Sequence, residues 1–106
     1  MRGATRLLGG RVVLITGGRD FDDAAAVRGA IEGLDPRPEL VLHGGSTGAD
    51  ALADRIAREL GIPVRVFPAD WIALRPDLVL AFPGGRGTAN CVLQARLAGI
   101  PTTVLS

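Results

Sequence analysis

The stretch LVLAFPGGRGTANCVLQARLAGIP, residues 78–101, contains a short apolar run, a glycine-rich turn and a longer amphipathic segment. A continuous apolar run of this length is typical of a strand that is buried on both faces. After the turn, the spacing predicts a helix over residues 88–98, with Thr88 as its N-cap and Gly99 as its stop. A strand that turns directly into a helix is half of a parallel βαβ unit, so this stretch indicates an α/β fold.

The same unit recurs on the N-terminal side of that stretch. Residues 21–34 predict a helix with Asp22 as N-cap, and residues 49–60 predict the strongest helix, with Gly61 just beyond its end. The apolar stripe of the second helix leaves Asp50 and Asp54 outside it, and consists of Ala49, Leu52, Ala53, Ile56, Ala57 and Leu60. Strand-like runs occupy residues 11–18, 40–45, 64–67, 77–82 and 102–105. This alternation predicts a five-stranded parallel sheet, and we expect the strand order 3-2-1-4-5.

The link between the third and fourth predicted strands is short. Only PADWIALRP, residues 68–76, joins them, whereas a crossover that contains a helix needs about ten to twelve residues or more. The link therefore holds at most one helical turn, and one face of the sheet would be thinly covered. We expect a homodimer to close this face, with Trp71, Ile72 and Leu74 in or near the interface. Alternation decides which strand residues face it, from the candidates Val12, Ile15, Val41, Val79 and Leu80.

Composition limits the remaining possibilities. The chain has 106 residues, 47% of them hydrophobic, and a net charge of +1. These values predict one folded domain over residues 11–106, preceded by a loose tail at residues 1–10, and they argue against a broad basic surface for nucleic acid. No run approaches the roughly 18 apolar residues of a membrane span. The single cysteine, Cys91, cannot form an internal disulfide and fits a cytoplasmic protein.

Three of the predicted strands end in glycine-rich turns. In an open parallel sheet, the turns after strands one, two and four lie at the carboxyl edge, close to the point where the strand order reverses and where ligands bind. Glycine lets the backbone approach a phosphate, helix N-termini favour negative charge, and arginine and hydroxyl side chains add donors. We therefore predict a site for a phosphorylated ligand that consists of Gly17, Gly18, Arg19, Gly44, Gly45, Ser46, Thr47, Gly48, Asp50, Gly84, Gly85, Arg86, Gly87 and Thr88.

Other polar residues carry weaker signals. We interpret His43 as a hydrogen-bonded structural histidine and Cys91 as a core residue, while Trp71 either packs or stacks on a base. No cluster of ligand types predicts a metal site, and no residue is assigned a catalytic role. Two alternatives stay open. One is a hydrolase of N-glycosidic or phosphoester bonds, with Asp20 or Asp50 as acid or base. The other is a module for single-stranded nucleic acid, which normally needs more aromatic and basic residues than this chain has.

Four segments together resemble the YspA/YpsA-related branch of the SLOG superfamily: VLITGGRDF (13–21), LVLHGGSTGADALADRIARELGIPV (40–64), FPADW (67–71) and AFPGGRGTANCVLQARLAGIP (81–101). The resemblance implies a Rossmann-like three-layer sandwich that binds or senses a nucleotide or a nucleotide-derived ligand. The related LOG phosphoribohydrolases carry a glutamate where this chain has Cys91, which argues against LOG-type hydrolysis. Relatives of this branch also have a longer segment, with an Arg-Asn pair and a helix, after the position of FPADW.

Overall fold

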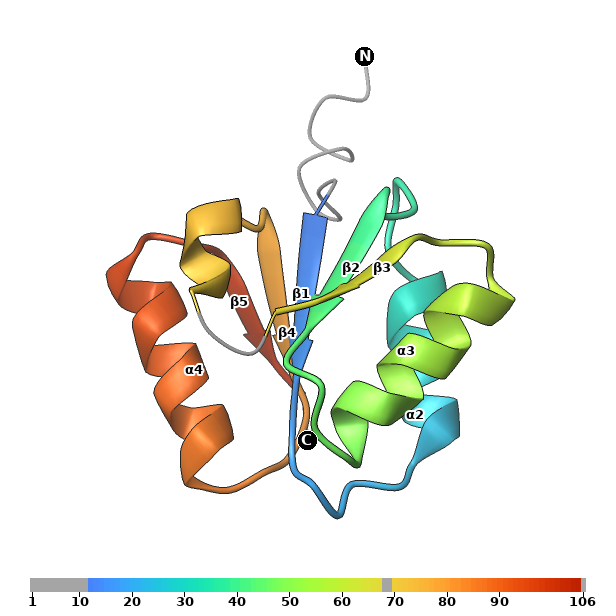
Figure 1. The fold of residues 1–106 in the computed structure, drawn as a ribbon, viewed down its shortest axis with the longest axis horizontal. Helices are drawn as coiled ribbons and strands as arrows, with labels where there is room; N and C mark the ends of the chain where they lie inside the picture. Colours follow the sequence, from blue (N-terminus) through green and yellow to red (C-terminus); the bar gives the residue numbers. More distant parts are fainter. Residues whose placement is uncertain (1–11, 68–69, 106) are drawn as a thin grey trace.

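The fold was analysed in a computed structural model, which describes residues 12–67 and 70–105. The tail predicted at residues 1–10 lies outside the described residues. The elements follow in the order β1 (Val12–Thr16), α2 (Ala24–Glu32), β2 (Leu40–His43), α3 (Ala49–Glu59), β3 (Val64–Val66), the 3-10 turn η1 (Trp71–Leu74), β4 (Leu78–Ala81), α4 (Arg86–Leu97) and β5 (Thr102–Val104) (Figure 1). Strands and helices alternate as the sequence predicted.

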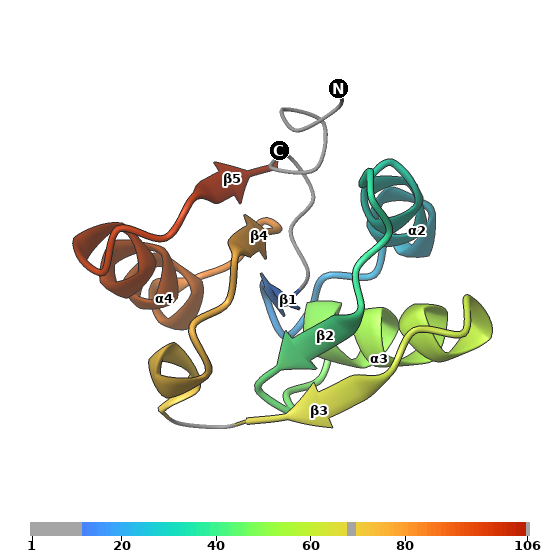
Figure 2. The same cartoon turned by 90° about the horizontal axis from the view of Figure 1, so that it is seen from above.

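The five strands form one parallel sheet in the order β3-β2-β1-β4-β5, which confirms the predicted α/β class and the predicted strand order. Helices α2 and α3 cover one face, whereas α4 and η1 cover the other (Figure 2). The strand order reverses at the neighbouring parallel strands β1 and β4, where Val13 pairs with Leu78: β2 and β3 are added on one side of β1, and β4 and β5 on the other. The carboxyl ends of these two strands therefore lie next to each other, and the turns that follow them diverge to opposite faces.

Two apolar layers separate the sheet from its helices. The layer under α2 and α3 contains Val13, Ile15, Val41 and Leu80. The layer under α4 and η1 is smaller and is formed by Leu14, Leu42, Val79 and Ala95, with Trp71 and Leu74 packed against it.

This arrangement corrects the expectation of a thinly covered face. Of the five candidates for that face, Ile15, Val41 and Leu80 point to the opposite side, while Val12 and Val79 belong to it. The central side chains there are already buried within one chain: Val79 and Leu42 are both 0% exposed. The short link fails to expose the sheet because Trp71 and Leu74 fold back over it.

The two expected N-caps were misplaced by one and three residues. Helix α2 is capped by Asp23 rather than Asp22, because the Asp23 carboxylate accepts a hydrogen bond from Ala26 N–H at 3.0 Å. Helix α4 begins at Arg86, with Gly85 as its N-cap, so Thr88 lies inside the first turn. Asp22 and Asp23 are equally suitable by type and only the observed hydrogen bond distinguishes them, whereas α4 begins at a glycine that makes no side-chain cap bond.

The ends of the helices agree with the sequence. Gly61 and Gly99 have φ of +77° and +76° and follow α3 and α4 directly, which is the left-handed conformation that glycine adopts after a helix. The predicted single helical turn in the short link is η1. Two non-glycine residues with positive φ flank it, Asp70 at 58° and Arg75 at 48°. Such residues are uncommon and persist where surrounding contacts hold them.

Candidate functional site

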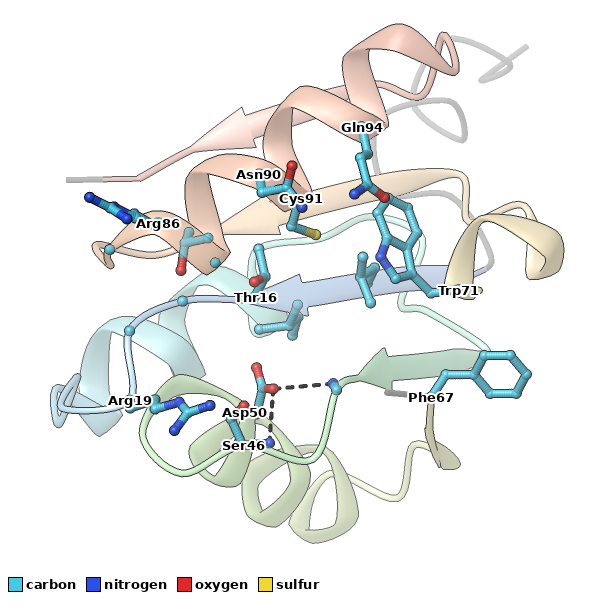
Figure 3. A pocket seen from close by; sticks show the side chains of 18 of the residues that line it. Thr16, Arg19, Ser46, Asp50, Phe67, Trp71, Arg86, Asn90, Cys91 and Gln94 are labelled. Atoms are coloured by element: carbon cyan, nitrogen blue, oxygen red, sulfur yellow. Dashed lines mark hydrogen bonds between the residues drawn. The ribbon is translucent and has the colours of Figure 1, made fainter. Parts of the chain in front are cut away.

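A cleft of about 600 Å³ opens at the carboxyl end of the sheet, between the start of α3 and the inner face of α4 (Figure 3). The carboxyl-terminal part of β1, from Leu14 to Thr16, forms its floor. The turns after β1, β2 and β4 all reach it, as expected for turns at one edge of a parallel sheet. Ten of the fourteen predicted site residues line the cleft: Gly17, Gly18, Arg19, Gly44, Ser46, Asp50, Gly85, Arg86, Gly87 and Thr88. The other four, Gly45, Thr47, Gly48 and Gly84, belong to the same turns but do not line it.

Several of the glycines are needed where the turns contact one another. A Cβ on Gly48 would lie 2.1 Å from the carbonyl oxygen of Gly18, and a Cβ on Gly84 would lie 2.6 Å from the Gly18 nitrogen. Backbone hydrogen bonds join the same turns, from Gly18 N–H to Pro83 O at 2.8 Å and from Ala49 N–H to Gly18 O at 3.1 Å. These glycines therefore serve close packing of backbone on backbone, a use that does not require a ligand.

The glycines at the start of α4 are different. A Cβ on Gly85 or Gly87 would meet nothing within 4 Å, so neither glycine is required by packing. No side chain caps α4, and its first helical hydrogen bond runs from Ala89 N–H to Gly85 O at 3.0 Å. The N–H groups that precede Ala89 are those that a helix cannot satisfy by itself. This turn is therefore open to an anion in the way that the sequence predicted.

The turn after β2 is closed by Asp50. This carboxylate is only 6% exposed, and its Oδ2 accepts hydrogen bonds from Gly44 N–H at 3.1 Å and Ser46 N–H at 3.2 Å. Both bonds are drawn in Figure 3. The expectation that Asp50 falls outside the buried stripe of α3 is wrong, because the side chain folds back onto the loop before its own helix. The N–H groups expected to receive a phosphate are thus already paired with a carboxylate.

Burial has a clear electrostatic effect on Asp50. Loss of solvent raises the pKa of its carboxyl above the usual value of 3.8, and the opposing effects of Ser46, His43 and Gly44 do not cancel it. The carboxyl lines the cleft, so it can accept a hydrogen bond from a ligand, and its raised pKa favours the protonated form more than in an exposed aspartate.

His43 is structural, as the sequence indicated. Its Nδ1 accepts a hydrogen bond from Gly45 N–H at 3.0 Å, and its Nε2 lies 2.7 Å from Oδ2 of Asp54. Asp54 also accepts from Arg58 Nε at 2.7 Å, and this bond is the main reason why the pKa of Asp54 is lowered. The network connects β2 to the outer side of α3, and His43 does not line the cleft.

Helix α4 supplies wall residues that the sequence analysis did not assign to the site. Asn90, Cys91 and Gln94 point into the cleft (Figure 3). Cys91 was expected in the core, and it does pack against the smaller apolar layer, but it also lines the cleft. Burial raises the pKa of its thiol, while a hydrogen bond with Thr16 acts in the opposite direction. A thiol with a raised pKa is a poor nucleophile near neutral pH.

Further lining residues come from the segment after β3. Phe67 and Trp71 lie at the end of the cleft away from Arg19 and Arg86 (Figure 3), and Asp70 also lines the cleft. Only Trp71 had been considered as a possible ligand contact from the sequence. The amphipathic period of α4 could have identified Asn90 and Gln94 as part of one polar face, but the sequence could not show that this face lines the cleft.

Two arginines stand at the outer end of the cleft near the glycine turns. Arg19 lies on the Asp50 side, where its carbonyl accepts a hydrogen bond from the Thr47 hydroxyl at 3.2 Å. Arg86 begins α4 on the other side. Neither guanidinium forms an ion pair with another residue of the ranges 12–67 and 70–105. Both are thus available to an anionic ligand.

Among the residues that the structure describes, no group of three or more His, Cys, Asp or Glu side chains could hold a metal ion. Within the same residues, no helix has the length and apolar character required to cross a membrane.

Comparison with known proteins gives two matches. The sequence model of the YspA, cpYpsA-related SLOG family matches residues 11–73. The chain is also 37% identical to the Gene 61 protein of Mycobacterium phage D29 over 116 aligned residues, which cover 86% of this chain and 93% of that protein. The family match includes the turns after β1 and β2, and it ends within η1.

Proposed function

Because the chain belongs to the YspA, cpYpsA-related SLOG family, we propose that its cleft binds a nucleotide or a nucleotide-derived phosphorylated ligand. A volume of about 600 Å³ suits a small molecule of this size. The observation that carries the proposal is the start of α4, which no side chain caps, which lines the cleft, and where a Cβ on Gly85 or Gly87 would meet nothing within 4 Å. The phosphate would bind there, with Arg86 and Thr88 as further donors.

The closed turn after β2 gives the ligand an orientation. A phosphate at Gly44 and Ser46 would have to displace Asp50 from both N–H groups and would face its negative charge. A hydroxyl group, by contrast, could donate to the carboxylate without breaking either bond. We propose that Asp50 accepts a hydrogen bond from a ribose hydroxyl, a role that acidic residues fill beside the sheet of other dinucleotide-binding folds.

Calorimetric titration with ribose 5-phosphate and the four common ribonucleoside 5′-monophosphates tests the proposal. We expect at least one of them to bind the wild type, and Gly85→Val to abolish binding because its branched Cβ blocks the approach to α4. Gly29→Ala serves as a control, since Gly29 is exposed on α2 and a Cβ there meets nothing within 4 Å. Equal affinity of the wild type and a folded Gly85→Val protein would refute the phosphate position. Native mass spectrometry of freshly purified protein would show whether a ligand is retained.

A second function is favoured by one observation, the raised pKa of Asp50 in the cleft. A carboxyl that holds its proton more strongly than usual can act as a general acid, so hydrolysis of an N-glycosidic or phosphoester bond is the alternative activity. Asp20, the other aspartate considered as an acid or base, does not line the cleft, whereas Asp50 does. Cys91 occupies the position of the glutamate of LOG enzymes and offers no acid of equivalent strength.

We further propose a homodimer that uses the outer side of α4. Leu93 and Leu97 lie four residues apart on one side of this helix and are 54% and 79% exposed. This surface replaces the sheet face as the contact expected from the sequence, since the sheet face is buried within one chain. Cys91, the single cysteine, is consistent with the cytoplasmic location that we propose.

A further inference from the structure

We infer that Trp71 and Gln94 form a recognition site for a nucleobase at the end of the cleft opposite the glycine turns. This inference rests on the proposed function and extends it from a phosphorylated ligand to one that carries an aromatic base. The cleft has two chemically different ends. Glycine turns and arginines form one end, whereas an indole and an uncharged amide lie at the other (Figure 3).

The indole of Trp71 is placed to stack on a planar group. It packs against the buried layer of Leu14, Leu42 and Val79, yet it remains partly exposed and lines the cleft. Figure 3 shows it directed from η1 toward α4, beside Gln94. One part of the ring is therefore fixed by the protein while another part is free for a ligand, which is how aromatic side chains hold bases in single-stranded nucleic-acid sites.

The backbone around Trp71 is consistent with this role. Asp70 and Arg75, on either side of η1, both have positive φ without being glycine. Such conformations are unfavourable for most residues that have a side chain, so the turn is held against local preference. Residues of this kind concentrate at ligand-binding positions. The strained turn brings Trp71 over the cleft, where it can meet a ligand.

Helix α4 sets the distance between the two ends. Gly87, Cys91 and Gln94 follow the spacing i, i+4, i+7, so they share one face of the helix, and all three line the cleft. From Thr88 to Gln94 the helix rises about 9 Å, at 1.5 Å per residue. This is close to the length of a nucleoside 5′-monophosphate from its phosphate to its base. Asp50 lies across the cleft from Cys91, at the level where the ribose would be.

Gln94 supplies the polar contact for the edge of the base. Its side-chain amide forms no hydrogen bond with another residue of the described ranges. An amide offers both a donor and an acceptor, which is the pattern that the edge of a nucleobase presents. Its lack of charge fits a base better than a second phosphate.

The chain contains one tryptophan, so its intrinsic fluorescence reports on Trp71 alone. We would titrate the wild type with the 5′-monophosphates of adenosine, guanosine, cytidine and uridine, and with ribose 5-phosphate. We expect at least one nucleotide to quench the fluorescence and to bind about tenfold or more tightly than ribose 5-phosphate, which has no base. Ribose 5-phosphate should bind without quenching.

Variants then distinguish the contribution of the base to the affinity from that of the phosphate. In calorimetry, Trp71→Leu should reduce nucleotide affinity to that of ribose 5-phosphate, whereas Trp71→Phe should keep most of the difference. Gln94→Leu should reduce the preference among the four bases. Val104→Ala, at an exposed position of the edge strand β5 that does not line the cleft, is the control and should change none of these affinities. Thermal unfolding of each variant identifies any loss that is due to misfolding, and Trp71→Phe retains an aromatic ring if Trp71→Leu fails to fold.

The possible results are distinct. If ribose 5-phosphate binds as tightly as every nucleotide and no nucleotide quenches Trp71, the base site is refuted while the phosphate site stands. If none of the five compounds binds, both proposals fail. In a separate titration with the four free nucleosides, a nucleoside that binds with quenching as tightly as its monophosphate would support the base site and refute the phosphate position at α4.

Discussion

Gly84 and Gly85 are neighbours with opposite structural roles, and an alanine at each should give opposite results. A Cβ on Gly84 would lie 2.3 Å from the Thr88 hydroxyl oxygen and 2.6 Å from the Gly18 nitrogen. Nonbonded heavy atoms are attracted most at about 3.5–4.0 Å, so both contacts are strongly repulsive. The Thr88 hydroxyl can rotate away, but the Thr88 Cβ, at 2.9 Å from the added Cβ, cannot. The Gly18 nitrogen cannot move without stretching its hydrogen bond to Pro83 O, which is 2.8 Å long.

The expected cost of Gly84→Ala combines two effects. Overpacking costs about 1–3 kcal/mol, and weakening one buried backbone hydrogen bond costs about 0.5–1.5 kcal/mol. The smaller entropy of an unfolded chain with alanine offsets about 0.4–1 kcal/mol. These ranges combine to a net loss of about 0.5–4 kcal/mol with a central value of about 2 kcal/mol, and the central value corresponds to a decrease in Tm of about 8–16 °C for a domain of this size.

For Gly85→Ala, a Cβ meets nothing within 4 Å and φ is −98°. The entropy gain of about 0.4–1 kcal/mol and the poorer N-cap nearly cancel, so Tm should change by no more than about 3 °C. Thermal unfolding followed by circular dichroism measures both variants against the wild type. A Gly84→Ala protein that unfolds within about 2 °C of the wild type would refute the reasoning that contacts between the turns, rather than a ligand, require this glycine.

Three further predictions concern charge, chemistry and assembly. Asp50→Asn keeps an oxygen for Gly44 and Ser46 but removes a charge that burial penalises, so the unfolding free energy of the variant relative to the wild type should rise as the pH increases above about 4. Because the pKa of Asp54 is lowered, Asp54→Asn should have the opposite effect on the unfolding free energy. This variant should be less stable than the wild type at neutral pH, and the difference should shrink as the pH falls below about 4. Urea denaturation across this range checks both, and a pH-independent difference for either variant would contradict the pKa direction assigned to that aspartate. We expect no release of free base from nucleoside monophosphates above the uncatalysed rate; release that survives repurification and disappears in Asp50→Asn would establish the hydrolase alternative. In sedimentation equilibrium the wild type should be dimeric and Leu93→Lys/Leu97→Lys monomeric, and a wild type that stays monomeric at high micromolar concentration would exclude the dimer.

Much of the fold could be predicted because several independent patterns agree. Apolar runs that end in glycine alternate with helical spacing, and parallel strands of this kind have few possible orders. One error occurs where two candidates are of the same type. Asp22 and Asp23 are equally good caps, and only the bond from Ala26 N–H to Asp23 distinguishes them. The burial of Val79 could not be predicted either, since it depends on how Trp71 folds back.

The sequence predicted which turns meet at the site, but not the role of each residue within those turns. The three turns could be placed at one edge of the sheet because the carboxyl ends of parallel strands lie at the same edge. It could not tell that Gly48 and Gly84 face other backbone while Gly85 faces the cleft, because these roles depend on distances between segments. Asp50 shows the same limit. Its residue type suits a ligand contact, but its bonds to the loop before α3 change which group of a ligand can approach.

Helix α4 is also the helix that the core holds least firmly. Its single fully buried residue is Ala95, whereas α3 buries Ala49, Asp50, Ala53, Ile56 and Ala57. Segments with little buried surface open locally at a small fraction of the global unfolding free energy, and their amide protons exchange with solvent faster. A ligand at the first turn of α4 would bind the closed form alone and suppress this opening by mass action. Occupancy of the cleft would then be recorded as slower hydrogen exchange along the whole helix, including its solvent-facing side where Leu93 and Leu97 lie.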